Sequence, residues 1–139
     1  MTTLLPQPVG IPVPGTSVRA APYWEACRRH ELVYQRCTVC GYVGPRPFTV
    51  CARCRGTEAT WEHSAGLGTL YSWTVVWRPQ RPAFVVPYAP AIVTMDEGYL
   101  MTSAVVGCEV EDLAPDLRLR VEFHPVSDDL VLPYFAPDR

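Results

Sequence analysis

The amino-acid sequence predicts a mainly β protein, in which a short N-terminal helix and a metal-binding ribbon precede a small closed barrel. Three observations predict this class. Fifteen of the 139 residues are proline, which excludes an all-helical bundle because each interior proline removes a helix hydrogen bond. Four of the six cysteines form two Cys-x2-Cys pairs. Beyond residue 61, apolar residues recur at every second position, as they do in half-buried strands.

Residues 1–20 are predicted to form an extended, proline-rich tail. They contain four prolines and two glycines and show little periodicity. Their apolar residues are unusual for a free linker, so two interpretations remain open. The tail either lies against a partner or is a disordered chain end.

Residues 21–60 are predicted to form a helix and a zinc ribbon. Residues 21–30 read as a short helix, because Pro22 suits the first turn and Arg28 and Arg29 suit the C-terminal end. Residues 32–36 have the composition of a strand that leads into the first cysteine pair. The two remaining cysteines, Cys27 and Cys108, are expected to be small buried hydrophobic residues.

A structural zinc ion is predicted at the four paired cysteines, Cys37, Cys40, Cys51 and Cys54. Four thiolates bind zinc tetrahedrally and leave no open coordination position, so catalysis at this metal is not expected. The sequence shows no secretory signal pattern, which favours a reducing cytoplasm over a disulfide scaffold. Iron in a rubredoxin-like site and redox-active cysteine pairs are the alternatives.

Two glycines support the ribbon interpretation. Gly41 directly follows the first pair and Gly56 lies two residues beyond the second. A tight cysteine turn often needs a positive φ at such positions, which glycine adopts without steric cost.

Residues 61–139 are predicted to form a five-stranded OB-fold barrel. The strands are expected from near Gly66 or Gly68 onward, at 91–95, at 99–106, at 117–123 and at 130–135. Asp96-Glu97-Gly98 is a hairpin turn signal between the second and third, and residues 78–90 form a proline-rich loop. Five strands of this length can close into a small barrel, and the OB-fold is a barrel of this kind.

The aromatic residues of this region are expected to lie mainly in the core. On the first barrel strand, the alternation places four side chains on one face: Tyr71, Trp73, Val75 and Trp77. Tyr88 joins the same aromatic set. An apolar acyl channel or a face offered to a partner is the alternative role of these residues.

Four segments together resemble a known family: Pro22-Tyr23-Trp24-Glu25, residues 35–41 (QRCTVCG), residues 68–75 (GTLYSWTV) and residues 95–98 (MDEG). The sequence is similar to the acyl-CoA-associated family with a rubredoxin-like zinc ribbon and an OB-fold, long known as a domain of unknown function. The resemblance covers residues 21–137. It implies a small accessory subunit that docks on a thiolase-type acyltransferase or an aldolase, including those of sterol side-chain degradation. It also implies that the catalytic residues lie on the partner and that this chain helps to form the acyl-CoA site.

The arginines agree with an anionic ligand near the ribbon. Residues 19–55 contain seven arginines and two acids, whereas residues 56–139 contain five arginines and twelve acids. Coenzyme A carries several phosphate charges, which the planar arginine side chain can bind in bidentate fashion. The candidate contacts with coenzyme A are Arg46, Arg53, Arg78 and Arg81.

Other functions find less support in the sequence. His30, His63 and His124 stand apart, without the spacing of a metal site, and no GxSxG motif is present, so a stand-alone enzyme is not favoured. Zinc ribbons and OB-folds also occur in nucleic-acid-binding modules, and this is the alternative function, but the acidic barrel would repel phosphate. No run of about 18 apolar residues is present, so no membrane span is expected.

Overall fold

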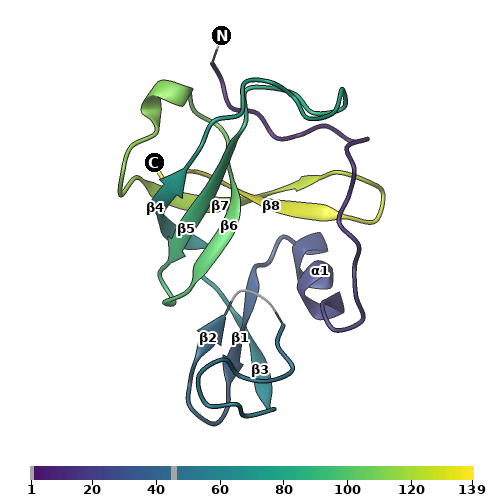
Figure 1. The fold of residues 1–139 in the computed structure, drawn as a ribbon, viewed down its shortest axis with the longest axis vertical. Helices are drawn as coiled ribbons and strands as arrows, with labels where there is room; N and C mark the ends of the chain where they lie inside the picture. Colours follow the sequence, from purple (N-terminus) through teal and green to yellow (C-terminus); the bar gives the residue numbers. More distant parts are fainter. Residues whose placement is uncertain (1, 45–46) are drawn as a thin grey trace.

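The computed structural model describes residues 2–44 and 47–139 as a mainly β protein (Figure 1). Within these residues, a single α-helix, α1 (Ala21–Arg28), precedes a three-stranded sheet of order β2-β1-β3. The ribbon strands are β1 (Val33–Cys37), β2 (Val43–Gly44) and β3 (Ala59–His63). The barrel strands are β4 (Leu67–Trp73), β5 (Ala89–Met95), β6 (Leu100–Val105), β7 (Arg118–Pro125) and β8 (Val131–Pro137). The predicted fold class of helix, ribbon and barrel is confirmed.

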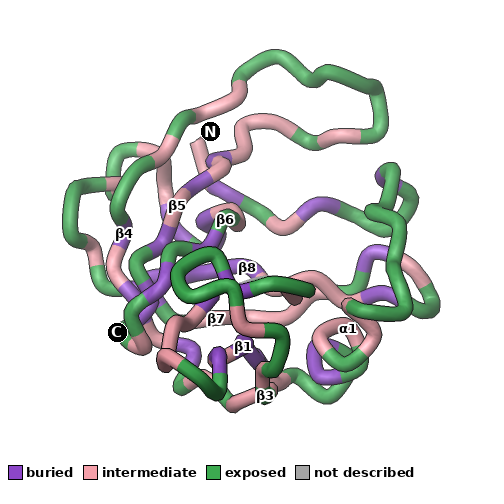
Figure 2. Tube along the Cα trace, turned by 60° about the horizontal axis from the view of Figure 1, so that its bottom comes forward, coloured by how far each residue is buried: buried purple, intermediate pink, exposed green. Residues whose placement is uncertain are grey.

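The barrel closes in the order β4-β5-β6-β8-β7, with β7 pairing back to β4. All neighbouring pairs are antiparallel except β6 and β8, which run parallel and share one register pair, Val105 with Phe135. This is the five-stranded barrel expected of an OB-fold. Its centre is filled by fully buried apolar side chains, among them Phe135, Leu119 and Val93. Figure 2 shows the buried stretches of the chain along the barrel strands.

The first barrel strand is shorter than the alternation predicted. The pairing of β4 with β5 shifts register between Leu70 and Ser72, which is the signature of a β-bulge. The extra residue, Tyr71, is 64% exposed, and Trp77, beyond the end of β4, is 57% exposed. The expectation that these two side chains lie in the core is therefore wrong, whereas Trp73 does pack against the core.

The helix ends two residues before its predicted end. His30 adopts φ +61°, and the N–H of Glu31 donates to the carbonyl oxygen of Ala26 over 2.9 Å. A left-handed residue with this backward hydrogen bond terminates a helix. The His30 ring stacks on Phe123 with a centroid distance of 5.4 Å, so the helix end is held against β7.

The ribbon and the barrel share one hydrophobic core. Leu32 and Tyr34, on and beside β1, belong to the same buried cluster as the barrel residues. The rings of Tyr34 and Tyr99 lie 5.2 Å apart. β3 spans the predicted boundary at residues 60 and 61, and it pairs with β1 of the ribbon along its whole length.

The segment after β3 is fixed by the hairpin turn between β5 and β6. Glu97 accepts hydrogen bonds from the hydroxyl of Ser64 and the backbone N–H of Ala65, both over 2.8 Å. Gly98 completes this turn with φ +102°, a conformation that favours glycine. The predicted turn at 96–98 therefore also holds the connection between ribbon and barrel.

The N-terminal tail is extended, but its first half is packed on the barrel of its own chain. The N–H of Leu4 donates to the Cys108 carbonyl and the N–H of Gly107 donates to the Leu4 carbonyl, both over 2.8 Å. The Leu4 side chain is completely buried in the barrel core. Packing of Leu4 and Ile11 against the same chain excludes a disordered end for this part of the tail. The alternative, contact with a partner, stays a prediction for the exposed side chains of Leu5 and Val9.

No helix within residues 2–44 and 47–139 combines the length and apolar character needed to cross a membrane.

We expect Leu4→Ala to lower the free energy of unfolding by about 2–5 kcal/mol, because it leaves a cavity in the core. The neighbouring Leu5 is 53% exposed, so the matched variant Leu5→Ala should change stability by no more than about 0.5 kcal/mol. Urea unfolding of both variants measures the difference. Equal effects of the two substitutions would show that the tail does not contribute to the core.

Candidate functional site

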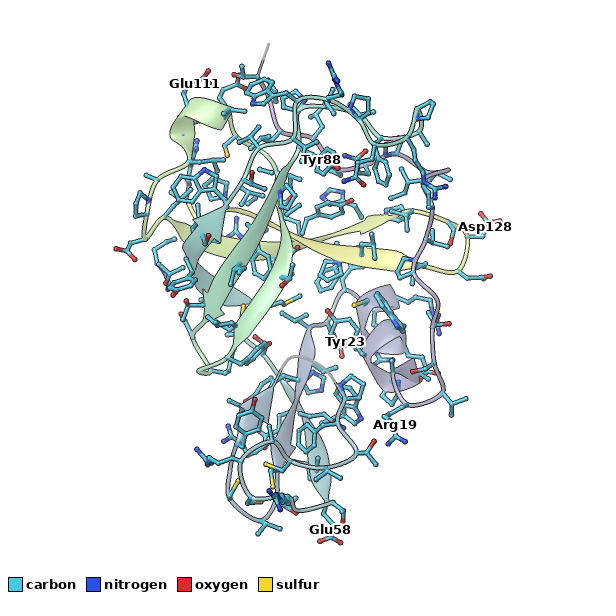
Figure 3. All side chains as sticks on the ribbon, in the orientation of Figure 1. Arg19, Tyr23, Glu58, Tyr88, Glu111 and Asp128 are labelled. Carbon is cyan, nitrogen blue, oxygen red and sulfur yellow. The ribbon has the colours of Figure 1, made fainter. Side chains whose placement is uncertain are left out.

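The four paired cysteines converge at the tip of the ribbon, at the end farthest from the barrel (Figure 3). Cys37 ends β1, and the other three follow in the two connecting turns. Their sulfur atoms all lie within 4.8 Å of one another. The Cys37–Cys54 and Cys40–Cys51 sulfur distances are 3.6 and 3.7 Å.

These distances fit a tetrahedral metal site. A disulfide needs a sulfur–sulfur distance of about 2.05 Å, which neither pair approaches. A tetrahedron with zinc–sulfur bonds of about 2.3 Å has an edge of about 3.8 Å. The four cysteines therefore have the geometry and the donor chemistry of a structural zinc site.

Backbone N–H groups stabilise the thiolate forms of the cysteines. The backbone N–H of Tyr42 donates to Cys40 and, aided by the Arg53 side chain, lowers the pKa of that thiol to about 6. In the second turn, the N–H of Gly56 points at the Cys54 sulfur over 3.3 Å. This contact lowers the pKa of Cys54, but burial and the neighbouring thiols outweigh it and raise that pKa to about 12. Hydrogen bonds to the charged form of an acid favour ionisation. The backbone N–H groups of the two turns therefore favour thiolates, the form that binds a metal cation.

The two turns reach this geometry differently. Gly41 has the expected positive φ, at +80°, but in the second turn the positive φ falls on Arg55, at +65°. Gly56 instead lies where the space for a side chain is tight. A Cβ atom there would lie 3.1 Å from a Val39 methyl group and 3.2 Å from the Cys54 sulfur.

The arginines assigned to coenzyme A are not brought together. Arg46 lies outside the described residues. Arg53 donates to the Cys40 carbonyl over 2.6 Å and covers the Tyr42 ring, so it braces the ribbon tip. Arg78 and Arg81 are exposed on the loop between β4 and β5, which lies at the opposite end of the molecule from the ribbon (Figure 1).

The groups that a stand-alone enzyme would use are dispersed. Cys27 and Cys108 are buried, as expected for small hydrophobic residues, and desolvation raises the pKa of Cys27 to about 12. His63 lies 3.7 Å from Glu31, and His124 lies 3.1 Å from Glu122. Within the described part of the chain, the ribbon cysteines form the one group of three or more potential metal ligands.

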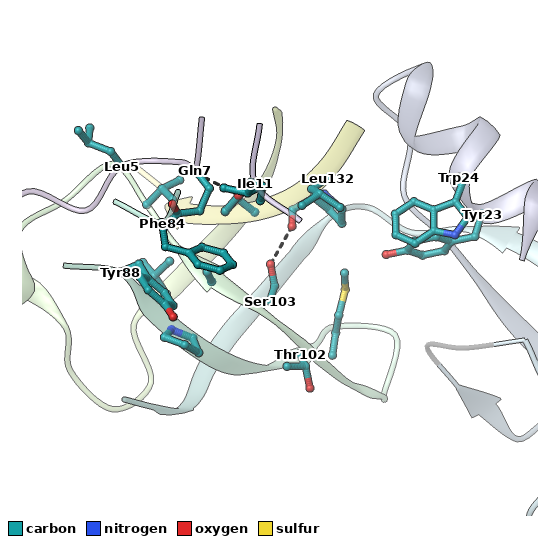
Figure 4. Close-up of a pocket in the computed structure, with 17 residues that line it drawn as sticks. Leu5, Gln7, Ile11, Tyr23, Trp24, Phe84, Tyr88, Thr102, Ser103 and Leu132 are labelled. Atoms are coloured by element: carbon teal, nitrogen blue, oxygen red, sulfur yellow. Dashed lines mark hydrogen bonds between the residues drawn. The ribbon is translucent and has the colours of Figure 1, made fainter. Parts of the chain in front are cut away.

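A cavity of about 360 Å³ lies beside the barrel, outside the β6–β8 seam. Its walls come from the tail, α1, β6, β8 and the end of the loop before β5 (Figure 4). Almost all of the lining is apolar. Sequence reasoning identified only Tyr88 of this wall as a channel candidate, because the other lining residues are distant along the chain and follow no common pattern.

Two family models match consecutive parts of the chain. The model described as the rubredoxin-like zinc ribbon domain of ChsH2 matches residues 24–59, and the C-terminal OB-fold domain of ChsH2 matches residues 61–124. A DUF35 domain-containing scaffold protein of Methanocaldococcus jannaschii is 30% identical over 103 residues, which are 73% of each chain. A probable enoyl-CoA hydratase alpha subunit of Thermomonospora curvata is 29% identical over 126 residues.

The match to the hydratase subunit covers 91% of this chain but only 40% of that protein, so this chain spans about two fifths of that relative. Among solved structures, a chain of an Ltp2-ChsH2(DUF35) aldolase superposes with a TM-score of 0.82 at 29% identity. That superposition covers 90% of this chain and 98% of the other. The two chains therefore share their complete two-part architecture.

We expect Cys51→Ser to abolish zinc retention and to unfold the ribbon sheet, because metal-binding energy at such a site is also folding energy. Cys108→Ser replaces a buried cysteine that is not part of the cluster and should keep one zinc ion per chain. Zinc content after dialysis against EDTA, together with amide hydrogen exchange in β1 and β3, measures both effects. Full zinc content in Cys51→Ser would contradict the assigned ligand set.

Proposed function

Since the chain belongs to the DUF35/ChsH2 family of zinc-ribbon and OB-fold proteins, we propose that it is an accessory subunit of an acyl-CoA enzyme complex. The partner we propose is a thiolase-type acyltransferase or an aldolase. The aldolase is favoured because the superposed chain comes from an aldolase complex. The observation that carries the proposal is the superposition on 98% of a chain from the Ltp2-ChsH2(DUF35) aldolase. The sterol pathway remains part of the proposal through a relative named 3-oxo-4,17-pregnadiene-20-carboxyl-CoA hydratase alpha subunit, from Mycobacterium tuberculosis.

The chemistry of the described residues supports an accessory role. Acyl transfer and carbon–carbon cleavage need a nucleophile or base with oxyanion donors in reach. The described histidines pair with carboxylates or stack on an aromatic ring, and the free cysteines outside the ribbon are buried. The reacting groups are therefore proposed to belong to the partner.

We propose that Cys37, Cys40, Cys51 and Cys54 hold a structural zinc ion. When bound, the ion supplies a four-way cross-link between the two turns of the ribbon and no open coordination position. Thiolate ligands persist in a reducing compartment, so a cytoplasmic location is part of this proposal.

The proposed contact with the partner includes the exposed aromatic residues of the β4 region. Tyr71 and Trp77 expose more than half of their surface, and burying this apolar surface against a partner would be favourable. Aromatic side chains are enriched at protein interfaces. Arg78 follows Trp77 directly and Arg81 lies three residues further on, so the same segment offers cations to the phosphates of a shared coenzyme A thioester.

The nucleic-acid alternative gains no support from two of the arginines, because carboxylates already pair with them. Arg118 forms two 2.9 Å hydrogen bonds with Asp96, and Arg36 forms hydrogen bonds of 3.0 Å with both carboxylate oxygens of Glu62. Arginines paired with carboxylates in this way are not available as a phosphate-binding track.

We expect the tagged chain, purified from its own host, to retain a thiolase-like or aldolase-like chain in stoichiometric amount. Trp77→Ser should reduce that yield at least severalfold without changing the melting temperature, because Trp77 is exposed in the isolated chain. Val18→Ser, at a residue that is 94% exposed on the tail, is the matched control and should leave the yield unchanged. Quantitative mass spectrometry of the eluted proteins gives the ratio.

Purification of the chain without any such partner would contradict the accessory role. Salt-dependent binding of the isolated chain to single-stranded RNA or DNA would instead favour the nucleic-acid module.

A further inference from the structure

We propose that the cavity outside the β6–β8 seam is a binding site for an uncharged aliphatic chain. The site itself stands on the geometry of the cavity. Only the assignment of that chain to the acyl group of a thioester rests on the proposed function.

The position of the cavity follows from the way the barrel closes. β6 and β8 share a single register pair, and beyond it Ser103 bridges the two strands by donating its hydroxyl to the Pro133 carbonyl over 2.8 Å (Figure 4). The outer side of this seam carries apolar side chains, including Ala104 and Leu132. The seam thus forms an apolar floor that no neighbouring strand covers.

The roof is built from two segments that are distant along the chain. Gln7, in the tail, forms hydrogen bonds in both directions with the backbone of Val85 in the loop, over 2.9 and 2.8 Å. The hydroxyl of Tyr134 accepts from the Gln7 N–H over 3.2 Å. These contacts hold Phe84 and Ile11 above the floor, and both side chains line the cavity.

The chemistry of the lining selects an uncharged ligand. None of the described lining residues carries a charge. The side chains of Gln7, Ser103 and Tyr134 already form hydrogen bonds within the protein. These three side chains therefore do not require a polar ligand atom as a partner. Ligand pockets lined mainly by apolar and aromatic side chains bind the apolar part of a ligand. The phosphates of a nucleotide would find no partner here.

The shape of the cavity fits a chain with a polar head. Tyr23 of α1 and Tyr88, directly before β5, both line the cavity and come from separate parts of the molecule (Figure 3). On the side of α1, a second cavity of about 570 Å³ shares Tyr23, Trp24 and Met101 with the first and includes Ser17. A chain lying in the first cavity can therefore leave its polar end in the second.

The size of the site limits its ligand. A volume of about 360 Å³ lies near the small end of the range of about 300–1,000 Å³ found for ligand pockets. This volume is sufficient for an aliphatic chain of moderate length.

The first test is the binding of a homologous series of alcohols to the zinc-loaded full chain. Butan-1-ol, hexan-1-ol and octan-1-ol should displace the fluorescent probe 1-N-phenylnaphthylamine. Affinity should rise about three- to fourfold for each added methylene group, as expected for transfer of an alkyl chain out of water. No displacement, or an affinity that does not depend on chain length, would overturn the proposal.

Variants locate the binding to this cavity. Ala104→Phe places a ring on the cavity floor and should weaken octan-1-ol binding by about tenfold or more. Ala114→Phe, the same substitution at an exposed residue outside the lining, should leave binding unchanged. If Ala104→Phe does not fold, Phe84→Ala removes part of the roof and should weaken binding severalfold. Binding at the native strength in a folded cavity variant would overturn the proposal.

Competition experiments distinguish the acyl group of a thioester from a free fatty acid as the source of the aliphatic chain. Octanoyl-CoA that competes with octan-1-ol, while acetyl-CoA does not, supports the acyl group of a thioester as the occupant. Competition by octanoic acid without competition by octanoyl-CoA supports the site and contradicts the thioester source. Failure of every aliphatic ligand would overturn the site alone, because co-purification of the partner tests the proposed function separately.

Discussion

Closure of the barrel between β6 and β8 is the constraint on which the rest of the structure depends. The two strands are parallel and meet at one register pair, where Phe135 is completely buried and its carbonyl accepts from the Val106 N–H over 2.8 Å. A closed barrel has no free edges, but a seam this short exposes apolar side chains on its outer side. The tail and the loop before β5 cover that side, and the cavity lies beneath them.

The ribbon is tied to this barrel by packing and by the hairpin turn of β5 and β6. Tyr34 enters the barrel core beside Tyr99, and Glu97 of the turn holds the segment that leaves β3. The cysteine cluster joins the two turns at the other end of the ribbon, and its residues do not belong to the described barrel core. Zinc binding and core packing therefore stabilise the two ends of one continuous structure, which suits a rigid accessory subunit.

The tail links stability to the proposed ligand site. Leu4 contributes to the core, whereas Gln7, three residues later, joins the tail to Val85. One short segment thus belongs both to the fold and to the roof of the cavity. The exposed residues Tyr71 and Trp77 lie outside this arrangement, so the surface proposed for the partner and the apolar cavity are distinct features.

The sequence by itself determined the elements whose signals are local. The Cys-x2-Cys spacing indicated the metal cluster, the alternation of Leu119 with its neighbours indicated β7, and Asp96-Glu97-Gly98 indicated the hairpin. Each depends on residues within a few positions of one another, as turn chemistry and strand periodicity do. Alternation alone could not show the bulge at Tyr71, because a single inserted residue reverses the facing of those that follow.

Only the tertiary structure decided what the tail does, where the arginines stand and that a cavity exists. Leu4 meets Cys108 and Gln7 meets Val85 across more than seventy residues of chain, and no local pattern encodes such a pairing. Arg53 and Arg78 share a charge and a residue type, yet the fold places one on the ribbon and the other on the loop at the far end. The sequence determines which groups are present, and the closure of the barrel determines which of them meet.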